Sequence, residues 1–508
     1  MNRYLSAELL RARHTALVWL PLAAIPLVAL TYNLAIVVNP DADAASILMW
    51  QAIYLTGFAA PLAALFAATA EQREKKANYG GTLWLVLDRK RERAARLTIV
   101  LVSLAAFHIL NFGGTGLLLT LGGRSDMNRV FFLGFCAFVG TIGVAGLATA
   151  LARLTNLLTT LVVFTAWQII GITRPVVEGD MWWACPMAWP VRLVLPILGV
   201  HQNSVPLEPG SALGRENPVF PLLLCALLAF IGIISATVAP EKWNTKNRRI
   251  GLPAFAAPRP APQPTAPSSA PSSAPSSAQF TPPSAPHYEP AVASRSATLS
   301  PRPYRALTLA ALTPAVKACF ALTAAAFLLT TLIYPRSYVH GLFAFAVLPL
   351  GAGLLPTLVW PALERAWAVM RVEYRPTARS MLLWNGACVL IVAAFATACG
   401  LAGGGNVVDE TRRFLIGTLV GYALVLVMVQ LQQRLGTSAA IIAVMIVTVF
   451  SATLGGDILA DTNLWSLAIS AWPNTATTLP RFGIAVITCA VIIAILQRPT
   501  EKLLNTKR

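Results

Sequence analysis

The chain has 508 residues, of which 56% are hydrophobic and only 12% are charged, and its mean hydropathy is +0.64. This composition excludes an ordinary soluble globular domain and indicates an all-α integral membrane protein. The formal net charge of +18 is explained by the membrane topology described below, so we expect no binding to nucleic acid.

Twelve apolar segments are long enough to cross a hydrocarbon core of about 30 Å, which takes roughly 20 helical residues. Six of them form a first unit over residues 1–250, at 16–38, 48–70, 98–121, 130–151, 157–172 and 218–238. Six more form a second unit over residues 305–508, at 317–334, 341–362, 382–402, 414–431, 438–455 and 480–496. The sequence therefore predicts twelve transmembrane helices, six in each unit.

A Pro/Ala/Ser-rich segment at 251–304 separates the two units and contains the run APSSAPSSAPSS at 266–277. Proline fixes φ and removes a backbone donor, and alanine and serine offer no large apolar surface. Such a segment cannot build a core and stays extended and solvated. We interpret it as a flexible linker.

Lys and Arg residues are concentrated at both termini, in the linker and in the connections that lie on the same side of the membrane as these. Positively charged loops stay in the cytoplasm, so both termini and the linker are predicted on the cytoplasmic side of the plasma membrane. A basic inner face also suits anionic membrane lipids. The N-terminal stretch MNRYLSAELLRARHT is amphipathic and leads directly into the first span, so no cleavable signal peptide is expected.

Two predicted outer connections have similar sequences, separated by 283 positions, as between residues 182 and 465. Residues 181–190 read MWWACPMAWP and residues 464–473 read LWSLAISAWP. Because each unit has an even number of spans, we expect parallel repeats about an axis along the membrane normal. Tryptophan favours the membrane interface, so these elements are expected to form either an outer gate or a structural belt. The residues concerned are Trp182, Trp189, Pro190, Trp465, Trp472 and Pro473.

A charged stretch follows the second span of each unit, at 71–97 and at 364–381. Both stretches mix dense charge with aliphatic residues and a tryptophan, Trp84 in the first and Trp367 in the second. This pattern favours a short helix on the membrane surface with its apolar side against the bundle. The alternative is a solvated loop that obeys the positive-inside rule.

Residues that would carry chemistry are absent from the predicted spans. No span interior contains Asp or Glu, which disfavours an ion-coupled carrier. His108 and Asn111 are the nearest approach to an intramembrane polar site, although a packing histidine is the commoner case. The sequence has no GxxxxGK[ST], HExxH, GxSxG or paired CxxC motif. We therefore expect no catalytic residue, metal or cofactor on this chain and do not expect an enzyme.

Three features together resemble an ATP-binding-cassette type-2 permease of the lantibiotic/bacteriocin-immunity or multidrug-export type. They are the amphipathic AELLRARHT before span one, the charged Trp-bearing stretch beginning with Glu after span two, and the Trp-Pro element between spans five and six. The resemblance covers nearly the whole chain outside 250–305 and implies two six-span permease units fused in one chain. It also implies export of amphipathic or hydrophobic compounds, such as antimicrobial peptides, drugs or lipids, and hence antibiotic resistance.

In such permeases, two separate ATPase subunits on the cytoplasmic face bind the ATP and Mg and supply the energy. The helix before span one and the stretch after span two press on these subunits, so the resemblance implies a set of coupling residues. They are Glu8, Arg11, Arg13, Glu71, Arg73, Glu74, Glu364, Arg365 and Glu373. The alternative is a twelve-span secondary carrier of the facilitator type, which has the same two six-span halves and cytoplasmic middle loop.

Overall fold

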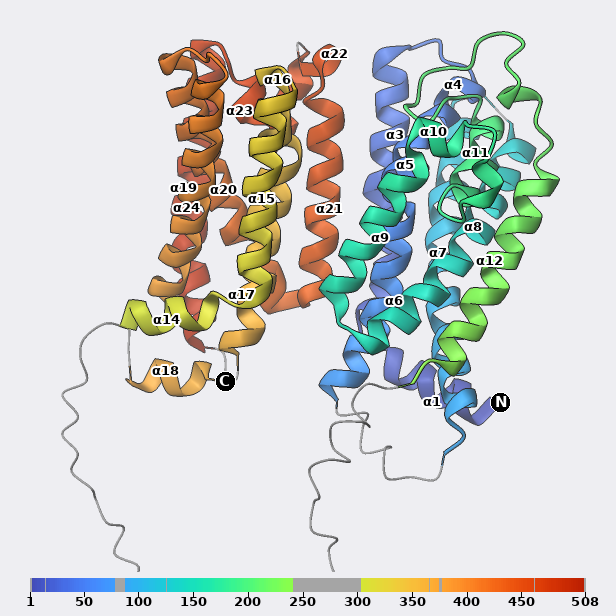
Figure 1. Cartoon of the computed structure of the whole chain (residues 1–508), viewed down its shortest axis with the longest axis horizontal. Helices are drawn as coiled ribbons and strands as arrows, with labels where there is room; N and C mark the ends of the chain where they lie inside the picture. The colour runs from blue at the N-terminus through green and yellow to red at the C-terminus, as the bar shows by residue number, and fades with distance from the viewer. Residues whose placement is uncertain are drawn as a thin grey trace, which may run out of the picture. The chain divides into compact units, whose positions relative to one another are not determined.

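The computed structural model describes residues 2–13, 15–77, 87–124, 126–240, 303–364, 366–373, 377–460 and 462–506. In these ranges every regular element is a helix (Figure 1), and one isolated β-bridge joins Val200 to Pro206. The predicted linker lies almost wholly outside the described ranges. We describe the helices before the linker and those after it separately.

The first unit is formed by long apolar helices with short helical turns in their connections. Figure 1 shows α7, α8 and α12 running alongside one another, as their contacts also show. The elements are α1 (Asn2–Ala12), α2 (Ala16–Trp19), η1 (Leu20–Ala23), α3 (Ala24–Val38), α4 (Ala44–Met49), α5 (Ala52–Gly57), α6 (Ala59–Lys76), α7 (Arg89–Leu121), α8 (Met127–Leu154), α9 (Leu157–Ile172), α10 (Arg174–Val177), η3 (Trp182–Ala184), α11 (Trp189–Leu198), η4 (Leu213–Arg215) and α12 (Val219–Val238).

The helices after the linker are also mostly long and apolar, and α20 packs against α17, α19 and α24. The second of these long helices contains a π-helical stretch, labelled η5. The elements are α14 (Pro303–Ala311), α15 (Pro314–Ile333), α16 (Arg336–Gly341), η5 (Leu342–Val347), α17 (Leu348–Leu363), α18 (Trp367–Glu373), α19 (Thr377–Ala402), α20 (Val407–Leu435), α21 (Thr437–Leu454), α22 (Asp457–Ala460), η6 (Asn463–Leu467), η7 (Ile469–Ala471), α23 (Trp472–Thr475) and α24 (Leu479–Thr506).

Ten helices in the described ranges are long and apolar enough to cross a membrane. An eleventh span results if the bent pair Ala44–Gly57 and Ala59–Lys75 is counted as one. The predicted span at 157–172 forms the 16-residue helix α9, which is shorter than the roughly 20 residues that a perpendicular span needs. The structure therefore indicates a multi-pass membrane protein, while the count of twelve and the parallel repeat stay predictions.

The bent pair is broken at Phe58, where the two helices meet at an angle of 55°. A break inside a membrane frees backbone groups that lipid cannot satisfy. The side chain of Gln168 on α9 satisfies them. Its Oε1 accepts from the Ala60 N–H at 2.9 Å, and its Nε2 donates to the carbonyls of Leu55 and Thr56 at 3.2 and 2.7 Å. One buried amide thus holds the bend in place.

Small residues allow α8 and α12 to approach closely. A Cβ added at Gly146 would lie 2.4 Å from the carbonyl carbon of Gly232, and one at Gly143 would lie 2.6 Å from that of Leu228. No side chain fits at such distances, so glycine is required where the two backbones meet. The contact brings the C-terminal ends of α8 and α12 together, next to the charged cluster described below.

Candidate functional site

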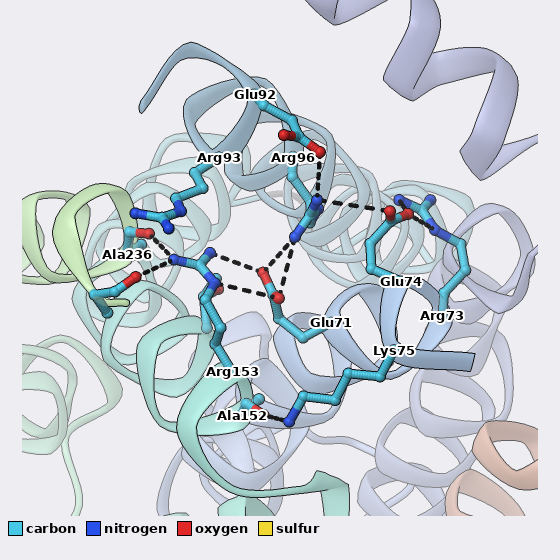
Figure 2. A network of polar contacts seen from close by, with 12 residues as sticks. Glu71, Arg73, Glu74, Lys75, Glu92, Arg93, Arg96, Ala152, Arg153 and Ala236 are labelled. Carbon is cyan, nitrogen blue, oxygen red and sulfur yellow. Dashed lines mark hydrogen bonds and ion pairs between the residues drawn. The ribbon is translucent and has the colours of Figure 1, made fainter. Parts of the chain in front are cut away.

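A cluster of charged side chains lies at one end of α6, α7 and α8 (Figure 2), and α1 packs against α7. Its members come from helix extensions that pass beyond the predicted spans. The helix expected to stop at residue 70 continues to Lys76, and the helix expected to begin at residue 98 begins at Arg89. The predicted ends of these two spans are therefore wrong, because residues 71–76 and 89–97 continue the long helices. Trp84, the predicted docking residue of the stretch at 71–97, lies outside the described residues.

Glu71 on α6 is the centre of the cluster. Its side chain is fully buried and accepts hydrogen bonds from two arginines (Figure 2). Arg96 on α7 donates Nη1 to the two carboxylate oxygens at 3.2 and 3.1 Å. Arg153 on α8 donates Nη2 and Nε at 2.9 and 3.3 Å. A carboxylate held in this way by charge-assisted bonds fixes three helices relative to one another.

A second group of ion pairs attaches α1 to the same cluster. Arg73 pairs with Glu8 on α1 and also with Glu74, to which its Nη2 lies at 2.7 Å. Arg11 on α1 approaches Glu74 at 3.5 Å. Arg96 joins the two groups because its Nη2 lies 3.7 Å from Glu74. The amphipathic N-terminal helix is therefore held by buried charges and not only by its apolar face.

Basic side chains of the cluster also bond to free carbonyls at helix ends. Arg153 donates Nη1 to the carbonyls of Ala236 and Ala239 at 2.7 and 3.1 Å. The last carbonyls of a helix have no partner within the helix and carry the negative end of its dipole. Arg153 thus caps α12 while it neutralises Glu71. Lys75 caps α8 in a similar way, with its Nζ 2.7 Å from the carbonyl oxygens of Ala152 and Thr155.

The cluster joins α1, α6, α7 and α8 through ion pairs. Each buried carboxylate of the cluster is paired with at least one guanidinium. Among the described residues, no group of three or more His, Cys, Asp or Glu side chains could hold a metal ion. What the arrangement can do is transmit a displacement of α1 to α6, α7 and α8, because breaking a buried pair is costly.

The predicted coupling residues fall into three groups. The structure brings Glu8, Arg11, Glu71, Arg73 and Glu74 into the cluster, where the three carboxylates are at most 3% exposed. A partner protein cannot reach those carboxylates. Arg13 and Glu364 are exposed. Arg365 and the side chain of Glu373 lie outside the described residues.

Four cluster members were missed by reasoning from the sequence, namely Lys75, Glu92, Arg96 and Arg153. Glu92 and Arg96 are four residues apart, a spacing that pairs side chains on one helix face, and their ion pair measures 3.2 Å. That spacing was a usable signal. Arg153 gave no such signal, because its acidic partner is 82 residues away in the sequence.

Each Trp-Pro element contains an indole hydrogen bond to the backbone of a residue six or seven positions earlier. In the first, Trp189 donates its indole N–H to the Trp183 carbonyl at 2.9 Å. In the second, Trp472 donates to the Trp465 carbonyl at 3.1 Å. Trp182 and Trp465 each lie 5.2 Å from an arginine guanidinium, a cation–π distance.

The four predicted Trp residues of these elements are at most 7% exposed, and Pro473 is buried while Pro190 is half-buried. Their rings thus contact the protein itself more than its surroundings. Whether they act as a gate or as a belt stays a prediction.

A histidine in the connection between α11 and α12 lies between two carboxylates. His201 Nδ1 is 3.1 Å from Glu178, and its Nε2 is 3.0 Å from Glu208. The hydrogen bonds to Glu208 and then to Glu178 raise the pKa of His201 above its usual 6.5. In return, the hydrogen bond from His201 lowers the pKa of Glu208. This link joins α10 to the connection that follows α11.

A comparable pair lies at the start of α20 in the second unit. His340 Nε2 lies 2.8 Å from Glu410, and Arg413 donates to the same carboxylate at 2.7 Å. Glu410 is 2% exposed although it precedes the predicted span at 414–431. The helix extends to Val407 and carries this acidic residue inside the protein.

Comparison of the chain with models of protein families, with curated proteins and with solved structures found no match.

Proposed function

We propose that this chain is the membrane-spanning permease subunit of an ATP-binding-cassette exporter in the plasma membrane, with both termini in the cytoplasm. Its substrates are amphipathic or hydrophobic compounds, and two separate ATPase subunits bind the cytoplasmic face and supply the ATP and Mg. The fused pair of six-span units replaces the two permease chains that such exporters otherwise assemble.

The observation that supports this proposal most is the buried ionic attachment of α1. An amphipathic helix outside the spans is joined through Glu8 and Arg73 to α6, and through Arg96 and Glu71 to α7 and α8. A force applied to α1 from the cytoplasm would therefore reach three helices at once. A permease without its own ATP-binding loop needs such a connection.

Within this mechanism the predicted coupling residues take two roles. The buried carboxylates hold the helices as one body, and the exposed Arg13 and Glu364 are the ones that can contact a partner. Arg11, with 35% of its side chain exposed, can do both.

The test is affinity purification of the tagged full chain from its native membranes in mild detergent, followed by an ATP hydrolysis assay. We expect an ATPase to co-purify, and we expect Arg13→Glu combined with Glu364→Lys to release it. The control is Arg174→Glu, an exposed residue on α10 that the topology places on the opposite face, and it should retain the ATPase. Absence of a co-purifying ATPase would contradict the proposal.

One observation favours the second candidate, a secondary carrier. His340 and Glu410 form a buried pair between two apolar helices, and an intramembrane carboxylate beside a histidine is typical of proton pathways. In proteoliposomes without nucleotide, this carrier would move substrate when a proton gradient is imposed, and His340→Gln would abolish the movement. The exporter would not move substrate in response to a proton gradient alone, and His340→Gln would not abolish its transport.

A further inference from the structure

The second unit contains an apolar cavity that the charged cluster and the Trp-Pro elements do not involve. Its volume is about 290 Å³, and it lies between α15, α17 and α19, with the π-helical stretch η5 along one side. The lining is almost entirely aliphatic and aromatic, including Val316, Phe320, Leu354, Leu358 and Val392.

Local backbone and side-chain features explain why this space stays open. A π-helical turn changes the register of the side chains that follow it, and such turns are frequent at functional sites. Gly351, which lines the cavity, has no side chain, and a Cβ built there would meet nothing within 4 Å. Neighbouring residues therefore leave room that a larger side chain at this position could occupy.

The cavity reaches the outer surface of the helices. Two lining residues, Leu322 and Leu350, are 67% and 37% exposed, and only 11% of the apolar window of α15 is buried. In a membrane, these surfaces contact hydrocarbon. An apolar cavity does not hold water, and one of about 150 Å³ already accommodates benzene. This cavity is nearly twice that size and opens toward lipid chains.

A positively charged residue lies near the end of α15 that lines the cavity. Lys317 is exposed in the first turn of α15, one residue after the cavity-lining Val316. Lysine near a helix end extends its ammonium group toward the membrane interface. From Phe343 to Leu358 the lining also runs along one helix for roughly 22 Å at 1.5 Å per residue. An elongated apolar site with a cation near the end of α15 matches a chain with an anionic headgroup.

We propose that this cavity binds one acyl chain of a membrane phospholipid, with the phosphate group of that lipid at Lys317. The site does not depend on the exporter mechanism, and it would exist equally in a secondary carrier.

The test uses proteoliposomes of the full chain with phosphatidylglycerol that carries a photoactivatable diazirine on one acyl chain. After illumination, cross-linked peptides are quantified by mass spectrometry. The internal reference is α24, whose apolar window is also 11% buried and which does not line the cavity. We expect at least threefold more cross-linking on α15 and α19 than on α24.

Three variants and a second probe make the result decisive. Gly351→Phe should remove the excess on α15 and α19, whereas Gly483→Phe on α24, where a Cβ also meets nothing within 4 Å, should leave it. Lys317→Glu should lower labelling by the phospholipid but not by a diazirine-bearing long-chain alcohol, which lacks phosphate. Equal labelling of α15 and α24 would overturn the proposal. So would preserved excess in Gly351→Phe, or labelling by the alcohol alone, which would identify a free apolar compound as the occupant.

Discussion

Neutralising Glu71 should destabilise the first unit more than any exposed charge change can. In Glu71→Gln, Arg96 keeps Glu92 at 3.2 Å and Glu74 at 3.7 Å. Arg153 keeps only the carbonyls at the end of α12, and its side chain is 0% exposed. Removing one partner of a buried ion pair costs about 3–5 kcal/mol, so we expect a loss of that size in the free energy of unfolding.

The matched control is Arg91→Gln at the start of α7, which removes an ion pair in which Arg91 Nε lies 3.0 Å from Asp88. Its partners are 64% and 45% exposed, and such a pair contributes about 0–1 kcal/mol. Equilibrium unfolding in mixed micelles can be followed by thiol labelling of Cys136 and Cys225, which are free and buried in α8 and α12. Before unfolding begins, these two cysteines should react with the thiol reagent at the wild-type rate in both variants.

The double variant Glu71→Gln/Arg153→Gln separates an unpaired charge from lost packing. It should be less destabilised than Glu71→Gln alone, because no buried guanidinium then lacks a carboxylate. If Glu71→Gln costs no more than Arg91→Gln, the network does not hold the helices together, and the mechanical argument for α1 fails with it.

Three further outcomes follow from the geometry. Gly146→Ala should destabilise the protein by about 1–3 kcal/mol, because the new Cβ would lie 2.4 Å from the Gly232 backbone. Gly113→Ala, whose Cβ would meet nothing within 4 Å, should instead stabilise the protein by about 0.5–1 kcal/mol. Thermal unfolding of both variants gives the sign of each change in stability. Gln168→Leu should cost about 1–3 kcal/mol for each backbone group left unpaired at the bend, measured in the same way. Because the pKa of His201 is raised in the folded protein, its bonds to Glu178 and Glu208 stabilise the connection fully below pH 6.5, and this stabilisation is lost as the pH rises through the folded-state pKa. Proteolysis of the connection should therefore accelerate as the pH rises in the wild type. In His201→Gln it should be independent of pH.

Local sequence was sufficient to predict the helical class and the position of most long helices. Hydropathy over about 20 residues determines whether a segment can cross a bilayer, and an α-helix satisfies its backbone bonds within the segment. Each predicted span therefore has a helix in the structure, including 16–38 and 218–238. Helix ends were harder to predict, since α6 and α7 continue into charged sequence that hydropathy assigns to loops.

The charged cluster was decided by tertiary structure. Residues 8, 71 and 74 were selected from the sequence as surface contacts, but the structure buries all three carboxylates among arginines. The bend held by Gln168 was equally out of reach, because its partners are more than 100 positions away in the sequence. Hydropathy is a local property, whereas the cost of burying a charge depends on which opposite charge the fold places beside it. The sequence by itself therefore determined which segments suit a membrane, and only the packing of α1, α6, α7 and α8 decided which charges those segments could bury.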